Sequence, residues 1–158
     1  MDIEQKDRAV VIGAGMAGLM AATVLSEQFA EVVIVEKDEL PSTPQIRKGV
    51  PQGAHVHTFL GFAVEAMEDF LPGIMSELYD AGAVKIRRNQ DIWFHDASGP
   101  TPIRDVGILT PSVTRPLLEH VTRQRVRDLP NVHFKEGARF TGFCSGLHSE
   151  VSGVKVQR

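Results

Sequence analysis

Cysteine and aromatic residues are scarce in this sequence. The single cysteine, Cys144, excludes a disulfide within the chain and any zinc site built from several cysteines. Charge is nearly balanced, with 17 basic and 20 acidic residues and a net charge of −3, which argues against a nucleic-acid-binding protein. No apolar run approaches the ~18 residues that a membrane span requires. The polar first eight residues do not form a secretory signal, and we expect a cytoplasmic protein.

What is present is the composition of an ordinary globular domain. The chain has 158 residues, of which 42% are hydrophobic and 23% are charged. These values exclude wholesale disorder and fit one domain more comfortably than two.

The first 36 residues predict a β-α-β unit. A short apolar run at 9–12 leads into a glycine-rich turn, helix-forming residues follow at 19–26, and a second apolar run at 32–35 ends in Glu36. Apolar runs of this kind are typical of parallel strands that are buried on both faces. The sequence therefore predicts an α/β, Rossmann-like FAD/NAD(P)-binding fold with additional β-strands.

The turn carries the G-x-G-x-x-G dinucleotide fingerprint in its required context. Gly13 allows a tight turn out of the strand, Gly15 lets a pyrophosphate approach the backbone, and Gly18 lets the helix pack closely. Unpaired N–H groups at the helix start favour phosphate, and Glu36 can accept hydrogen bonds from ribose hydroxyls. The charge of Glu36 disfavours a 2′-phosphate, but the motif alone does not separate FAD from NAD. The candidate cofactor-binding residues here are Gly13, Ala14, Gly15, Met16, Ala17, Gly18 and Glu36.

The remaining pattern predicts a long loop followed by mixed helices and strands. Proline and glycine break residues 37–57, which we interpret as a functional loop. Helices are predicted at 58–70, 74–80 and 115–129, the last capped by Thr114 and with a solvated face that carries Arg123, Arg125 and Arg127. Short strands are predicted at 84–86, 92–94, 103–106, 131–134, 138–144 and 151–156, the final two as a hairpin across 145–150.

Three segments resemble FAD-dependent monooxygenases of the aromatic-hydroxylase and squalene-epoxidase type. The first is the glycine turn together with Glu36 and Lys37, where the family often has Glu-Arg. The second, residues 47–57, resembles a bacterial branch that includes polyether epoxidases. The third, residues 114–134, resembles the family's S-R-x-x-L-E helix and the strand after it. The resemblance makes FAD the expected cofactor.

The resemblance also implies a reaction and further cofactor contacts. Arg115 would lie beside the flavin or its pyrophosphate, where an arginine fork suits phosphate. Arg47 and Gln52 would lie near the isoalloxazine, and Lys37 joins the cofactor-binding set. The parent reaction would insert one oxygen atom from O₂ into a small organic substrate, with NAD(P)H as reductant. No catalytic acid or base can be named, and no oligomeric state is predicted.

Two histidines in the loop do not define a metal site. His55 and His57 share a face in an extended stretch, but zinc normally has a third protein ligand. We therefore predict no metal.

Other functions stay open. Family members are much longer, so we expect residues 1–158 to be the FAD-binding domain at the N-terminus of a longer flavoprotein and to be inactive alone. The alternatives are a non-catalytic or truncated nucleotide-binding module, or a related flavin reductase or halogenase. A halogenase should show a Trp-x-Trp-x-Ile segment, whereas Trp93 is the single tryptophan.

Overall fold

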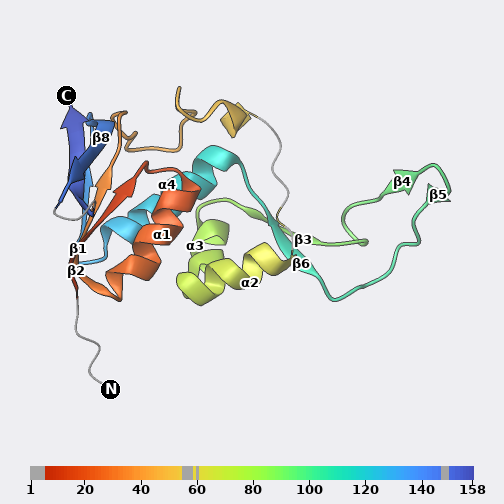
Figure 1. The fold of residues 1–158 in the computed structure, drawn as a ribbon. Helices are drawn as coiled ribbons and strands as arrows, with labels where there is room; N and C mark the ends of the chain where they lie inside the picture. The colour runs from red at the N-terminus through yellow and green to blue at the C-terminus, as the bar shows by residue number, and fades with distance from the viewer. Residues whose placement is uncertain (1–5, 55–58, 60, 147–149) are drawn as a thin grey trace, which may run out of the picture.

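The protein folds as a mixed α/β structure with a parallel sheet, as the sequence predicts (Figure 1). A computed structural model describes residues 6–54, 59, 61–146 and 150–158. Its elements, in chain order, are β1 (Lys6–Ile12), α1 (Met16–Ser26), β2 (Phe29–Val35), the 3₁₀ helix η1 (Pro51–Ala54), α2 (Gly61–Phe70), α3 (Ile74–Asp80), β3 (Val84–Arg87), β4 (His95–Asp96), β5 (Gly99–Pro100), β6 (Leu109–Ser112), α4 (Arg115–Arg127), β7 (Val132–Lys135), β8 (Arg139–Ser145) and β9 (Val151–Gln157).

The first three elements form the predicted β-α-β unit. Strands pair in parallel in the order β1-β2-β7, with Val11 opposite Ile34 and Val35 opposite Lys135. The sheet thus brings the carboxyl ends of β1, β2 and β7 to one edge, where ligands of open α/β sheets bind.

One face of this sheet is closed and the other is open. Val32, Ile34 and Val132 pack against Leu19 of α1 and Val126 of α4. On the opposite face, Val10 and Ile12 are 37% and 47% exposed. They border a cleft of about 500 Å³ between the sheet and the β8–β9 hairpin. The expectation that both faces of the first strand are buried is therefore wrong, because alternate side chains of β1 face this cleft.

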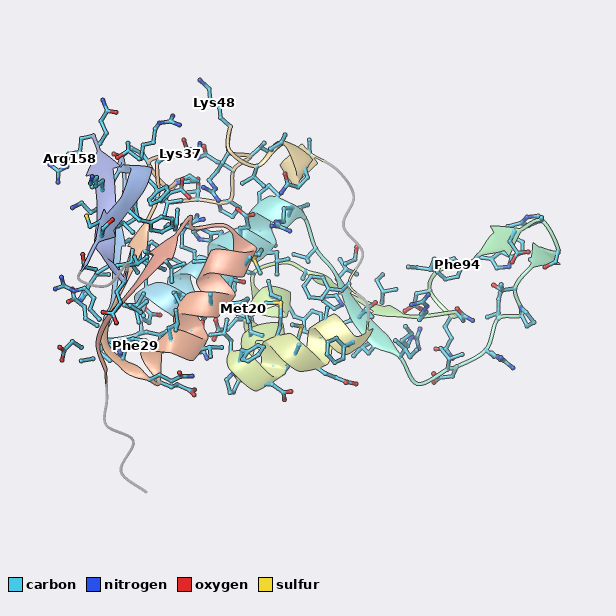
Figure 2. The ribbon with its side chains drawn as sticks, viewed as in Figure 1. Met20, Phe29, Lys37, Lys48, Phe94 and Arg158 are labelled. Atoms are coloured by element: carbon cyan, nitrogen blue, oxygen red, sulfur yellow. The ribbon has the colours of Figure 1, made fainter. Side chains whose placement is uncertain are left out.

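A second hydrophobic core lies between helices α2, α3 and α4. Phe59, Met67, Ile74 and Leu78 of the α2–α3 region pack with Leu118 of α4 and neighbouring apolar residues. Met20 extends from α1 towards this cluster (Figure 2). Helices α1 and α4 consequently tie the two cores together.

Helix positions follow the sequence closely. Helix α3 has the predicted bounds, α2 begins at Gly61 rather than 58, and α4 ends at Arg127 rather than 129. Thr114 caps α4 as predicted, with its hydroxyl accepting a hydrogen bond from the Leu117 N–H. No helix within the described part of the chain has the length and apolar character to cross a membrane.

Strand predictions between β3 and β6 are partly wrong. Residues 92–94 and 103–106 form no strand, and β4 and β5 are a two-residue ladder on an arm that projects from the body (Figure 1). β6, which was not predicted, pairs antiparallel with β3. The apolar residues of the arm do not meet a core: Trp93 is 65% exposed and Ile103 is 69% exposed. The β8–β9 hairpin is confirmed.

Candidate functional site

The glycine turn after β1 is built by backbone geometry that a side chain would disturb. Gly13 has φ = 95°, in the region that favours glycine, and its N–H donates to the Val35 carbonyl at 2.8 Å. A Cβ on Gly18 would lie 1.9 Å from the Gly13 carbonyl oxygen. The close approach of α1 to the turn therefore requires glycine at position 18.

The start of α1 is left open for a ligand. Gly15 is the N-cap residue, and no side chain caps the helix. A Cβ on Gly15 would meet nothing within 4 Å. Among the described residues, no acceptor is recorded for the N–H groups of Met16 and Ala17. These free donors and the positive end of the helix dipole favour an anionic group beside Gly15.

Glu36 lies at the end of β2 and is tied directly to the glycine turn. Its carboxylate accepts hydrogen bonds from the N–H of Ala14 at 2.8 Å and of Asp38 at 3.0 Å. The side chain is only 8% exposed. Since a carboxylate offers about four acceptor positions, Glu36 keeps capacity for a ligand hydroxyl.

Arg47 is brought from the loop to the same turn. Its guanidinium donates to the Ala14 carbonyl at 3.3 Å and makes a long contact with Glu36 at 3.5 Å. It also donates to Glu119 of α4 at 3.2 Å. The buried Nε of Arg47 has no partner among the described residues. Arg47 thus retains donor capacity that the described residues do not use.

Arg115 is connected to Arg47 through Glu119, which accepts hydrogen bonds from both. Its Nε donates to the second oxygen of Glu119 at 2.8 Å, four residues along α4. Arg123, one turn further on, is 2% exposed and donates to the Pro41 carbonyl at 2.9 Å. Burial, followed by the charge of Arg47, lowers the pKa of Arg123. The expectation that Arg123 lies on a solvated face is therefore wrong, because the loop covers this side of α4.

The other candidate residues lie around the same edge of the molecule. Lys37 is paired with Asp38 at 2.7 Å (Figure 2 labels Lys37 near the carboxyl edge of the sheet). Gln52 lies exposed on η1. His55 and His57 lie outside the described residues. Within the described residues, no group of three or more potential metal ligands is found.

A cleft of about 350 Å³ runs along these residues. Its walls come from the glycine turn, the end of β2, the loop after it and the start of β8. The residues that line it are Ile12, Gly13, Gly15, Val35, Glu36, Lys37, Asp38, Arg47, Gly49, Val50, Ala138, Arg139 and Phe140. Glycine at position 49 permits the loop to close against the pair of Lys37 and Asp38, since a Cβ there would lie 2.6 Å from Asp38 Oδ2.

The donor set of this cleft fits a dinucleotide with a pyrophosphate. Arg47 and Arg115 pair with Glu36 and Glu119, and the buried Arg123 interacts electrostatically with Arg47 and Glu119. The unpartnered Arg47 Nε and the N–H groups at the start of α1 are donors that suit phosphate oxygens.

Comparison with known proteins agrees with this geometry. Residues 8–87, which include the glycine turn, Glu36 and Arg47, match the family described as FAD binding domain. The chain belongs to this FAD-binding domain family. A protein of Mycobacterium tuberculosis H37Rv, Rv3254, is 37% identical in an alignment of 133 residues that covers 80% of this chain. The resemblance found in the sequence is thereby confirmed at the level of the family.

Solved structures share the fold of this FAD-binding domain. The probable FAD-dependent monooxygenase PqsL from Pseudomonas aeruginosa has a TM-score of 0.67 at 14% identity over 97% of this chain. The p-nitrophenol 4-monooxygenase PnpA from Pseudomonas putida has a TM-score of 0.62 at 17% identity over 90% of this chain. The myxobacterial chondrochloren halogenase CndH has a TM-score of 0.68 at 16% identity over 98% of this chain.

The chain spans only a minor part of each of these proteins. It covers 28% of Rv3254, 38% of PqsL, 34% of PnpA and 33% of CndH. The likeness to the solved structures accordingly concerns the fold of the FAD-binding domain.

Glu119, Arg139 and Phe140 are among the residues of the site that the sequence analysis missed. Glu119 is buried and accepts hydrogen bonds from two arginines, and Arg139 and Phe140 line the cleft. The spacing of Arg115 and Glu119, four residues apart on a helix, was a usable signal for their ion pair. No sequence signal places the start of β8 beside the end of β2, because this contact depends on the path of the chain through α4 and β7.

Proposed function

We propose that the chain binds FAD, with the adenosine and pyrophosphate in the cleft beside the glycine turn. The observation that carries this proposal is the buried pairing of Glu36 with Arg47 at the open N-terminus of α1. A carboxylate for ribose hydroxyls and cationic donors for phosphate are thereby placed side by side.

Each candidate residue has a role in this proposal. Glu36 accepts hydrogen bonds from the ribose and repels a 2′-phosphate. The N–H groups after Gly15, together with Arg47 and Arg115, donate to the pyrophosphate. Arg47 takes this role in place of the expected one near the isoalloxazine, because its guanidinium lies against the Ala14 carbonyl of the glycine turn. Lys37 lines the cleft and Gln52 lies exposed on η1, and both contact the outer parts of the cofactor in this proposal. The apolar Val50 and Phe140 supply packing surface within the cleft.

We propose that residues 1–158 form the N-terminal FAD-binding domain of a flavin-dependent oxidoreductase. Within this class, we propose a monooxygenase or epoxidase. When bound, FAD supplies the redox chemistry that transfers one oxygen atom from O₂ to a small organic substrate. The chain's own residues bind and orient the adenosine half of the cofactor. NAD(P)H as reductant rests on the resemblance to FAD-dependent monooxygenases, and the epoxidase branch rests on the resemblance of residues 47–57.

Ligand titration tests the binding proposal. We expect purified protein to quench FAD fluorescence on binding, ADP to compete, and FMN, which lacks the adenosine, to bind much more weakly. Glu36→Gln should weaken FAD binding by about tenfold, since a hydrogen bond to a charged group contributes about 1.5–3 kcal/mol. Glu31→Gln, which alters an exposed ion pair with Arg8, is the matched control. Equal affinity for FMN and FAD would contradict the assignment of the cleft.

Oxygen consumption separates a monooxygenase from a non-catalytic module. A protein that carries this domain should oxidise NADH or NADPH in air and should do so faster with its organic substrate. Tight FAD binding with no oxidation of either reductant by the longest natural form of the protein would favour the non-catalytic alternative.

A further inference from the structure

We propose that Glu119 is a positioning residue of the cofactor site, which holds Arg47 and Arg115 in the orientation that binds phosphate. This inference rests on the proposed FAD function and extends it to a residue that lines no part of the cleft. Glu119 is 4% exposed and lies on the covered side of α4.

Glu119 divides its two carboxylate oxygens between two arginines. Oε1 accepts from Arg115 Nε at 2.8 Å, and Oε2 accepts from Arg47 Nη2 at 3.2 Å. Arg115 comes from the same helix, whereas Arg47 comes from a loop 72 residues earlier in the chain. One carboxylate therefore sets the relative position of two cations that local sequence alone would not bring together.

The hydrogen bond to Glu119 leaves the terminal nitrogens of Arg115 available. Arg115 Nε donates to Glu119, and no partner is recorded for the two terminal nitrogens among the described residues. The Arg115 side chain is 18% exposed. A guanidinium held at Nε by a buried carboxylate presents its terminal N–H groups in a fixed direction, which suits bidentate binding of a phosphate.

Glu119 also fixes the position of the Arg47 guanidinium. Arg47 Nη2 is shared between Glu119 and the Ala14 carbonyl, so Glu119 helps hold the guanidinium against the glycine turn. The Arg47 Nε stays without a partner among the described residues. Loss of the Glu119 charge would leave Arg47, Arg115 and the buried Arg123 to repel one another, with Glu36 beside Arg47 and Glu136 near Arg123 as the remaining anions.

A purely structural role for Glu119 predicts a different behaviour. In that case the residue would only fasten the loop 37–54 to α4, and its loss would lower stability without acting through Arg115. Glu136 offers the matched control, because it fastens the same loop by accepting from the Leu40 N–H at 2.6 Å and pairs with Arg127. Glu136 does not line the cleft that contains the glycine turn.

The experiment compares Glu119→Gln with Glu136→Gln in the purified protein. The glutamine preserves shape, but it removes the charge and turns an N–H donor towards one of the arginines. We expect Glu119→Gln to raise the Kd for FAD by about tenfold or more and Glu136→Gln by less than about twofold, at similar losses in melting temperature. Comparable Kd values for the two variants would overturn the proposal.

A double-mutant cycle with Arg115→Ala shows whether Glu119 acts through its partner. In the Arg115→Ala background, the factor by which Glu119→Gln raises the FAD Kd should be clearly smaller than in the wild type. The same factor in both backgrounds would overturn the positioning role. If the wild-type protein itself does not bind FAD, the proposed function fails; if it binds FAD and Glu119→Gln binds equally tightly, the present inference alone fails.

Discussion

Gly15 and Gly18 perform different tasks although they belong to one motif. Gly18 is required by the protein itself, because the Gly13 carbonyl occupies the space of its Cβ. Gly15 faces open space, so the folded chain does not require glycine there. At the residue scale, one glycine therefore serves packing and the other serves the ligand.

Alanine at these two positions should separate stability from binding. Gly18→Ala should destabilise the fold by about 1–3 kcal/mol, since α1 must move away from the turn, and should weaken FAD binding as well. Gly15→Ala should cost about 0.5–1 kcal/mol, because its Cβ meets no neighbour but alanine is a poorer N-cap residue than glycine. It should nevertheless weaken FAD binding strongly.

Chemical denaturation and FAD titration of both variants check this expectation. Wild-type affinity in Gly15→Ala would show that the pyrophosphate does not approach this part of the turn.

The helices whose apolar residues meet a core were predicted well, whereas the two expected strands in the arm did not form. Helices α3 and α4 appear within two residues of the expected bounds, because their apolar spacing matches the second core. Residues 92–94 and 103–106 have a similar apolar character but are exposed in the arm. β-Propensity predicts a strand only where a partner strand is available, and that depends on the tertiary structure.

The side chain of Asn131 links the start of β7 to the chain between α1 and β2. Its Nδ2 donates to the Ser26 carbonyl at 2.8 Å and to the Phe29 carbonyl at 2.9 Å, and thus joins the start of β7 to the turn between α1 and β2. Asn131→Ala should lower the free energy of unfolding by about 1–3 kcal/mol, because two partly buried carbonyls lose their donor. FAD affinity should stay unchanged, since Asn131 does not line the cleft.

Urea denaturation and FAD titration of Asn131→Ala measure the two effects. A loss of affinity as large as that caused by Gly15→Ala would contradict the separation of this connection from the site.

The whole molecule combines two packed cores with a projecting arm. The cores meet at α1 and α4, whereas residues 91–98 of the arm are all exposed (Figure 2 labels Phe94 on it). Few backbone hydrogen bonds hold the arm, among them Arg88 N–H to the Ile108 carbonyl and Thr101 N–H to the Phe94 carbonyl. The arm therefore contributes little to the stability of the domain.

Hydrogen–deuterium exchange should show that the arm is less protected than the packed cores. We expect amides of residues 91–107 to exchange within seconds, because most lack buried partners, and those of β2 to be protected by global stability. Mass spectrometry of peptides from both regions measures the contrast. Protection of the arm equal to that of β2 would contradict the described exposure.

The sequence by itself determined the β-α-β unit, the glycine fingerprint with Glu36 and the capped helix at 115, because each depends on local spacing and on residue chemistry. The tertiary structure alone decided which charged groups from distant parts of the chain meet. Arg47 lies beside Glu36 and Glu119, and Arg123 is buried beneath the loop. No local pattern encodes these contacts, since they form only when the loop folds back over α4 and the buried charges must find partners.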